Sequence, residues 1–166
     1  MTFKVDDWVV HPRHGVGQIV NIEMHQFDSG VAQPYYQIAI PNGTMWVQVD
    51  ESASGLRKVT PKGELARYRE VLKSRPAALT EDHQERQIEL ADRLRQGSLQ
   101  VRCELVRDLS ALGWKKRLNE ANAAISRLAT QVLVQEWAMA EDVPLGDAAS
   151  EVKRLLNEGK SAYMAA

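Results

Sequence analysis

The hydrophobic pattern of this chain changes once, near Thr60. Before Thr60, short runs rich in Val, Ile and Tyr alternate with polar residues, which is typical of half-buried strands. After Thr60, apolar residues recur three or four positions apart, as they do on one face of an α-helix. We therefore expect an α+β fold in which a small sheet comes first and helices follow it.

Strand-like segments separated by turn signals fill the region before Thr60. Asn42 and Gly43 stand between two alternating runs, and both tolerate positive φ, so they predict a hairpin. Gly15 and Gly17 suit a sharply bent strand, where a Cβ would obstruct the bend. Short strands joined by short turns indicate a small Tudor- or SH3-like β-barrel. The strands are expected at 3–5, 8–11, 16–24, 35–40 and 45–49, with turns at 11–15, 28–30 and 41–43.

Capping residues and glycines divide the remainder into helices. Thr60 and Thr80 are expected to cap the first two helices, and Gly97 is expected to end the second. The apolar spacing predicts a bundle of about five helices. They are expected at 61–74, 81–96, 98–113, from 119 onward, and from 144 to about 159. The expected division is a β domain at 1–60 and a helical domain at 61–166.

Charge is distributed unevenly along the chain, whose formal net charge is only −1. Residues 1–60 contain 4 basic residues (Lys and Arg) and 6 acidic residues (Asp and Glu). Residues 86–127 contain 9 basic residues and 5 acidic residues. A near-neutral module followed by a basic one suggests two different partners, although two solvated surfaces would look the same.

No pattern in the sequence predicts enzyme chemistry. His11, His14 and His25 lack carboxylate or thiol companions at ligand spacing, and the single Cys103 lies on an apolar helix face, so we expect turn-lining histidines and a core thiol. Phosphate loops, nucleophile elbows and zinc motifs are missing. We expect no catalytic residue, no metal and no cofactor. One cysteine and no membrane-length apolar run or signal peptide predict a cytoplasmic protein without a membrane partner.

Two stretches are candidate binding surfaces. Residues 31–40 alternate well and contain Pro34, as an edge strand does, so this strand could accept a partner's strand with Tyr35 or Tyr36 and Trp46 as anchors. A capped edge with both tyrosines in the core is equally consistent.

The second stretch, residues 114–117, displays a tryptophan and three cations on a connector between helices. Cations beside an aromatic ring suit phosphate contact and sugar or base packing, although such charges are often only solvated. Arg86, Arg93 and Arg107 on neighbouring helices could extend this basic patch. Trp137 is expected in the core.

The opening residues 3–23 resemble the start of the RNA polymerase-interacting domain that CarD-type proteins share with transcription–repair coupling factors. The helical half carries VRDL at 106–109 and LVQEWAMAE at 133–141, which are similar to CarD/CdnL segments at the same separation. The resemblance covers nearly the whole chain.

The resemblance implies a bacterial transcription regulator, nucleoid-associated through RNA polymerase and acting as a monomer. Its Tudor-like domain would dock on the lobe of the polymerase β subunit. Its helical domain would contact promoter DNA nonspecifically, through minor groove and phosphates, near the upstream edge of the −10 element and modulate open-complex stability. The implied polymerase contacts are His25, Tyr35, Tyr36, Gln37, Ile38, Trp46 and Gln48. The implied DNA contacts are His83, Arg86, Arg93, Trp114, Lys115, Lys116 and Arg117.

Three positions depart from the family pattern. His25 and Gln48 replace arginines on the polymerase side, and His83 replaces a tryptophan that wedges into the opening DNA fork. His83 is flanked by Glu81, Asp82 and Glu85, which repel phosphate. The alternative is therefore an adaptor that binds one protein through the barrel edge and another through the bundle, without DNA contact.

Overall fold

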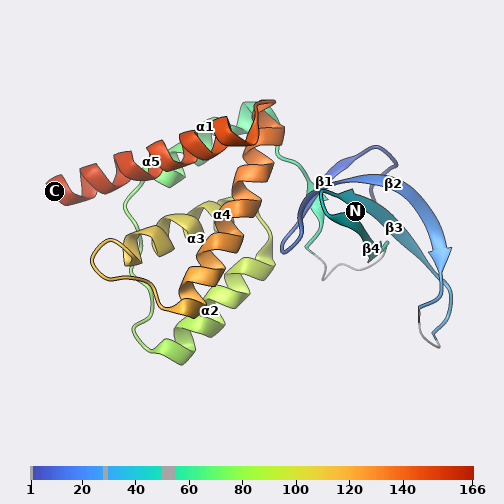
Figure 1. The fold of residues 1–166 in the computed structure, drawn as a ribbon, viewed down its shortest axis with the longest axis horizontal. Helices are drawn as coiled ribbons and strands as arrows, with labels where there is room; N and C mark the ends of the chain where they lie inside the picture. The colour runs from blue at the N-terminus through green and yellow to red at the C-terminus, as the bar shows by residue number, and fades with distance from the viewer. Residues whose placement is uncertain (1, 28–29, 50–54) are drawn as a thin grey trace.

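The computed structural model describes residues 2–27, 30–49 and 55–166, with a sheet at one end and helices at the other (Figure 1). The sheet is antiparallel and five-stranded, in the order β4-β3-β2-β1-β5. The expected α+β class, with an N-terminal sheet followed by five helices, is confirmed. The strands are β1 (Trp8–His11), β2 (Gly15–His25), β3 (Gln33–Ile40), β4 (Gly43–Gln48) and β5 (Arg57–Lys58).

Three details of the predicted sheet are wrong. Residues 3–5 form no strand, although Phe3 is buried and its N–H donates to the Tyr36 hydroxyl at 2.9 Å. The short β5 was not expected. The segment containing Pro34 is not an edge, because β3 pairs with β2 on one side and β4 on the other. Proline is tolerated there because it is the second residue of the strand, where few ladder bonds are lost.

Glycines allow the tight connections of the sheet. Gly43 has a φ of 150° at the start of β4, consistent with the hairpin expected at Asn42-Gly43. Gly15 has a φ of 80° at the turn between β1 and β2. The expected turn at 28–30 includes residues outside the described part of the chain.

A small apolar core lies inside the curved sheet. A register shift between Ile19 and Asn21 bends β2, so that Ile19 faces inward opposite Ile38. The buried members of this core are Phe3, Val9, Ile19, Tyr36, Ile38, Met45 and Val47.

The helices begin at polar caps and enclose a larger core. Side chains of Asp82, Ser98 and Asn119 accept hydrogen bonds from the third residue beyond each of them. Gly97 ends its helix with a φ of 78°, as expected. A 3₁₀ turn (η2, Lys62–Glu64) precedes α1 (Leu65–Lys73), α2 (His83–Gln96), α3 (Leu99–Leu112), α4 (Glu120–Glu141) and α5 (Leu145–Ala165).

The two threonine caps were predicted incorrectly. The Thr60 hydroxyl donates to Glu136, and the Thr80 hydroxyl donates to Glu89. Asp82 caps α2 instead, because its carboxylate reaches the Glu85 N–H at 2.9 Å. The last helix extends to Ala165, further than expected. Trp137 and Cys103 lie in the helical core as expected, and burial raises the pKa of the thiol, which keeps it protonated.

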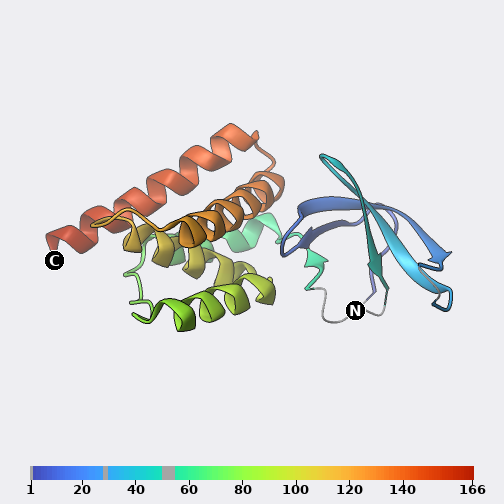
Figure 2. The same ribbon diagram turned by 60° about the horizontal axis from the view of Figure 1, so that its bottom comes forward.

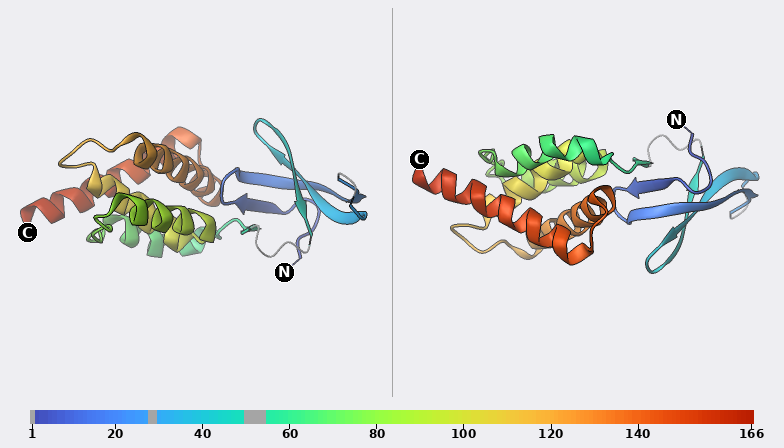
Figure 3. Two further views of the ribbon diagram at one scale, coloured as in Figure 1. Left: turned by 90° about the horizontal axis from the view of Figure 1, so that it is seen from below. Right: turned by 90° about the horizontal axis from the view of Figure 1, so that it is seen from above.

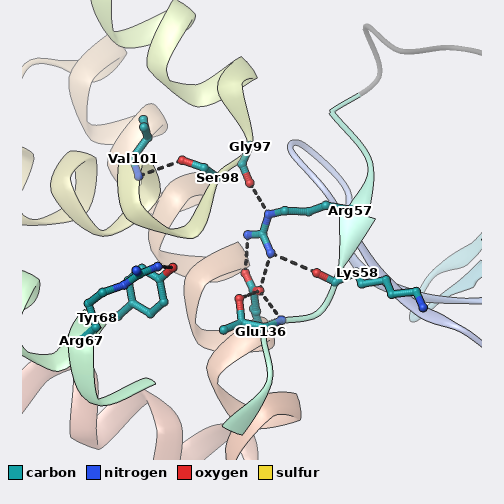
Figure 4. Close-up of polar contacts among 9 residues, drawn as sticks. Arg57, Lys58, Arg67, Tyr68, Gly97, Ser98, Val101 and Glu136 are labelled. Atoms are coloured by element: carbon teal, nitrogen blue, oxygen red, sulfur yellow. Dashed lines mark hydrogen bonds and ion pairs between the residues drawn. The ribbon is translucent and has the colours of Figure 1, made fainter. Parts of the chain in front are cut away.

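An ion pair joins the sheet to the bundle (Figure 4). Arg57 on β5 donates both terminal nitrogens to Glu136 on α4, at 2.6 and 2.7 Å. Glu136 is fully buried and also accepts the N–H and hydroxyl of Thr60. Burial raises the pKa of the Glu136 carboxyl, but the Arg57 and Thr60 hydrogen bonds outweigh burial and hold the pKa below its ordinary value.

Apolar contacts reinforce this junction. The turn between β1 and β2 reaches the bundle (Figures 2 and 3). There Val10 and Val16 pack against Val132 of α4, and the Val16 N–H donates to the Gln135 side chain at 3.1 Å. The sheet is therefore attached to α4 by both buried polar and apolar contacts. Among the described residues, no helix combines the length and apolar character needed to cross a lipid bilayer.

Candidate polymerase-binding and DNA-binding surfaces

Four rings gather on the outer surface of β2–β4. The cross-strand register sets Tyr35 opposite Glu23 and Trp46 opposite Gln37, on the face away from the barrel core. The ring centroid of His25 lies 4.3 Å from that of Trp46, and Phe27 lies 4.9 Å from Tyr35. We call His25, Phe27, Tyr35 and Trp46 the aromatic face. A part-exposed aromatic cluster of this kind suits protein recognition.

The predicted polymerase contacts divide between the two faces of the sheet. His25, Tyr35, Gln37, Trp46 and Gln48 are only part-buried and lie on the outer face. Tyr36 and Ile38 are 2% and 0% exposed, so their side chains lie in the core and cannot reach a partner. The prediction for those two side chains is wrong, and the alternative that placed the tyrosines in the core is correct for Tyr36.

Strand β4 is the sheet edge beside the aromatic face. Among the described strands it pairs only with β3. The Val49 N–H donates to the Pro34 carbonyl at 3.0 Å, so the alternate N–H groups of Gln48 and Trp46 point away from β3. These outward groups can accept a strand from a partner.

The connector between α3 and α4 carries the expected cations. Lys115, Lys116 and Arg117 are exposed, and none forms an ion pair with a described carboxylate. Trp114 is half-buried and packs against Tyr163 of α5, with ring centroids 5.4 Å apart. The ring is thus held by the bundle while the three cations face solvent.

The arginines expected to extend this patch are engaged internally. Arg93 and Arg107 both pair with the buried carboxylate of Asp108, at 3.0 and 2.9 Å. Arg86 is 9% exposed and donates to the carbonyls of Thr80 and Glu81. The prediction that Arg86 and Arg93 form an open surface with the connector is therefore wrong.

His83 lies next to the connector. It is the exposed first residue of α2, and its Nδ1 lies 2.8 Å from Arg86 Nη2. A pocket of about 220 Å³ lies between this helix start and the connector. Its polar lining includes His83, Arg86, Lys116, Arg117, Asn119 and Asn122.

Sequence reasoning did not identify Phe27, Tyr163 or Asn122. Phe27 lies two residues after His25, so the alternation of β2 would have placed it on the same face had the strand been extended. Tyr163 and Asn122 are brought to the site only by helix packing. In the described residues no group of three or more His, Cys, Asp or Glu side chains is arranged to hold a metal ion.

Comparison with known proteins matches both halves of the chain. Residues 3–60 match the CarD-like/TRCF RID domain, and residues 67–153 match the C-terminal domain of CarD. A Bacillus subtilis (strain 168) protein named "Putative transcription factor YdeB" is 28% identical over 137 residues, which cover 81% of this chain and 89% of that relative. The chain therefore belongs to the CarD family of transcription regulators, and its N-terminal part is the RNA polymerase-interacting domain characteristic of that family.

Proposed function

We propose that this protein binds the β subunit of bacterial RNA polymerase through residues 1–60 and contacts promoter DNA through residues 61–166. The DNA contact is nonspecific, lies near the upstream edge of the −10 element, and modulates the stability of the open complex. The observation that carries the proposal is the succession of a polymerase-interacting domain and a CarD C-terminal domain in one chain.

The edge of β4 is the proposed polymerase-docking element. Its outward N–H groups supply main-chain bonds, and the adjacent aromatic face supplies side-chain contact. Docking by main-chain bonds does not need the arginines that His25 and Gln48 replace. The replacement removes possible ion pairs and leaves the backbone pairing intact.

A proline substitution separates main-chain from side-chain docking. Gln48→Pro removes one outward N–H without breaking the bonds to β3, so the fold is retained and polymerase binding is weakened. Gln48→Ala keeps the N–H and serves as the matched control. Co-purification of the full chain with RNA polymerase measures both variants, and equal binding by both would exclude strand addition at Gln48.

The exposed cations of the connector are the proposed phosphate contacts. Charge reversal at Lys115, Lys116 and Arg117 should reduce the slope of log affinity against log salt by about one for each phosphate that the protein no longer neutralises. Duplex DNA binding measured across a salt series tests this, and an unchanged slope would assign these cations to solvent.

An adaptor function without DNA contact is the second candidate. It is favoured by the internal pairing of Arg93 and Arg107 with Asp108, which leaves fewer free cations on the bundle. His83→Trp distinguishes the two candidates, because a larger ring at a true wedge position should lengthen the lifetime of the open complex. Promoter footprints that are identical with and without the substitution would support the adaptor.

A further inference from the structure

A cleft of about 470 Å³ lies between the sheet and the place where α4 gives way to α5. Val9 of β1 points into the sheet core, so its neighbours Trp8 and Val10 lie on the opposite face of the strand. On that face Val10 packs against α4, whereas Trp8 lines the cleft. The cleft is therefore a gap beside the junction, and its walls come from both halves of the chain.

The walls of this cleft are mostly apolar and are fixed by packing. Val16 and Met139 belong to the cluster that joins the sheet to α4, and the Val16 N–H donates to the Gln135 side chain at 3.1 Å. Trp8 and Leu145 also line the cleft, and they are 43% and 57% exposed although both side chains are large and apolar. Covering such surface with an apolar ligand is favourable. The volume also lies within the range of about 300–1,000 Å³ that is usual for small-ligand sites.

One end of the cleft carries negative charge that no described residue neutralises. Asp142 lines the cleft and ends α4 in the left-handed conformation, with a φ of 58° and a ψ of 51°. The adjacent Glu141 pairs with Arg69, whereas the Asp142 carboxylate forms no ion pair within the described chain. The last carbonyl groups of α4 add partial negative charge at the same helix end, where an acidic side chain is unfavourable. A bound cation would relieve this repulsion.

No cationic side chain of the described residues supplies that charge, because neither Lys nor Arg lines the cleft there. A peptide is a poor candidate, because the strands that line the cleft are not sheet edges. β1 has β2 and β5 as paired neighbours, and β3 has β2 and β4. A peptide in the cleft would therefore lack the main-chain hydrogen bonds that strand addition supplies. Together with the volume, this favours a small ligand over a protein segment.

We propose that the cleft binds a small organic cation, with its apolar body against Trp8 and Leu145 and its ammonium or guanidinium group beside Asp142. Such a ligand contacts the sheet on one side and the α4–α5 corner on the other. It binds the folded junction only, so it stabilises the attachment of the sheet to the bundle. Neither the β4 edge nor the connector cations take part, and the site is independent of the proposed function.

Three probes that share one apolar body test the site. They are 4-phenylbutylammonium, 4-phenylbutanol and 4-phenylbutyrate, which are cationic, neutral and anionic at neutral pH. Each is titrated into the full-length ¹⁵N-labelled protein, where the indole N–H signal of Trp8 should shift and that of Trp46 should not. The ammonium probe should bind about threefold more tightly than the alcohol, as an exposed charge contact allows, and the carboxylate should bind most weakly. Equal affinity for all three probes, or no shift of the Trp8 signal, overturns the inference.

Asp142→Asn tests the charged end of the cleft. Asparagine is tolerated in the left-handed conformation, so the end of α4 is retained. This variant should lose the preference for the ammonium probe over the alcohol. Asp147→Asn is the matched control, because it removes the same charge from the first turn of α5 at a residue that does not line the cleft. Loss of the preference in both variants, or in neither, overturns the site.

Two further measurements identify any other occupant. A blocked Phe-Leu-Lys peptide that shifts the Trp8 signal at lower concentration than 4-phenylbutylammonium would overturn the small ligand in favour of a protein partner. A Trp8 signal that moves with protein concentration alone would overturn it in favour of a second copy of this chain. Weaker binding of the peptide, together with a Trp8 signal that is independent of protein concentration, supports the small organic cation.

Discussion

At the scale of single residues, Gly17 is a position where the sheet has no room for a side chain. A Cβ on Gly17 would lie 2.6 Å from Ile38 Cγ2 and 2.9 Å from the Ala39 carbonyl oxygen. Gly17→Ala should therefore lower the free energy of unfolding by about 1–3 kcal/mol, as overpacking does. Gly146→Ala is the control, since no described atom beyond its chain neighbours and its own helix backbone lies within 4 Å of its Cβ position. Urea denaturation with equal losses for both variants would contradict this account.

The environment of His11 should make the free energy of unfolding depend on pH. Burial, followed by the charges of His14, Arg102 and Arg13, lowers the pKa of His11 from 6.5 to about 4. Its Nδ1 accepts the N–H groups of Arg13 and His14, which requires an unprotonated nitrogen. The folded state therefore binds this proton more weakly than the unfolded state does, so the stabilisation is present above pH 6.5 and is lost as pH falls toward 4.

His11→Asn tests this dependence because the amide oxygen preserves an acceptor but does not titrate. As pH falls from 6.5 toward 4, the wild type should lose more of its free energy of unfolding than the variant does. Identical pH profiles for the two proteins would show that His11 makes no such contribution.

At the scale of elements, local signals in the sequence predicted most helices and strands. The Asn42-Gly43 hairpin, the helix end at Gly97 and the helix starts at Ser98 and Asn119 depend on a few adjacent residues, so the sequence contains the needed information. The two-residue β5 shows no alternation, and it pairs with β1, the strand most distant from it in sequence. Non-local pairing of this kind leaves no local pattern.

The candidate sites were predictable to different degrees. Arg86 lies four and eight residues before the buried Leu90 and Leu94, so helical spacing alone could have placed it on the buried face. The pairing of Arg93 with Asp108 depends on the packing of α2 against α3, which no spacing within one helix reveals. The exposure of loop cations such as Lys116 was easier to predict, because charged connectors usually lie on the protein surface.

The cap of α3 gives a prediction at this scale. Ser98 Oγ accepts the Val101 N–H at 3.1 Å, and this bond satisfies one of the unpaired donors of the helix start. Ser98→Ala should lower the free energy of unfolding by about 1 kcal/mol, whereas Ser98→Asp should retain the cap. Thermal or urea unfolding measures both, and equal stability of Ser98→Ala and wild type would contradict the assigned cap.

At the scale of the whole molecule, the Arg57–Glu136 pair should make sheet and bundle unfold together. Glu136→Gln leaves the Arg57 charge without its partner and should lower the free energy of unfolding by about 3 kcal/mol. This value is at the lower end of the range for breaking a buried ion pair, because the Arg57 side chain is 25% exposed. Replacing both residues by apolar ones should recover part of the loss. Denaturation followed separately on each half measures the effect, and unchanged stability of the single variant would contradict it.

Acid should weaken the same junction. The depressed pKa of Glu136 means that its contribution is present above the ordinary value of 4.5 and is lost as pH falls through the lower folded value. The sheet would then separate from α4 more readily, and the spacing between the β4 edge and the bundle would no longer be fixed.

Docking on RNA polymerase through the edge of β4, which pairs only with β3 among the described strands, is the central proposal. Size-exclusion co-elution of the full chain with bacterial RNA polymerase core enzyme tests it most directly. We expect a stable complex that survives charge reversal at Lys115, Lys116 and Arg117 and is weakened by Gln48→Pro. Failure to co-elute at high micromolar concentration, or a complex that disappears with the connector charges and is untouched by Gln48→Pro, would contradict it.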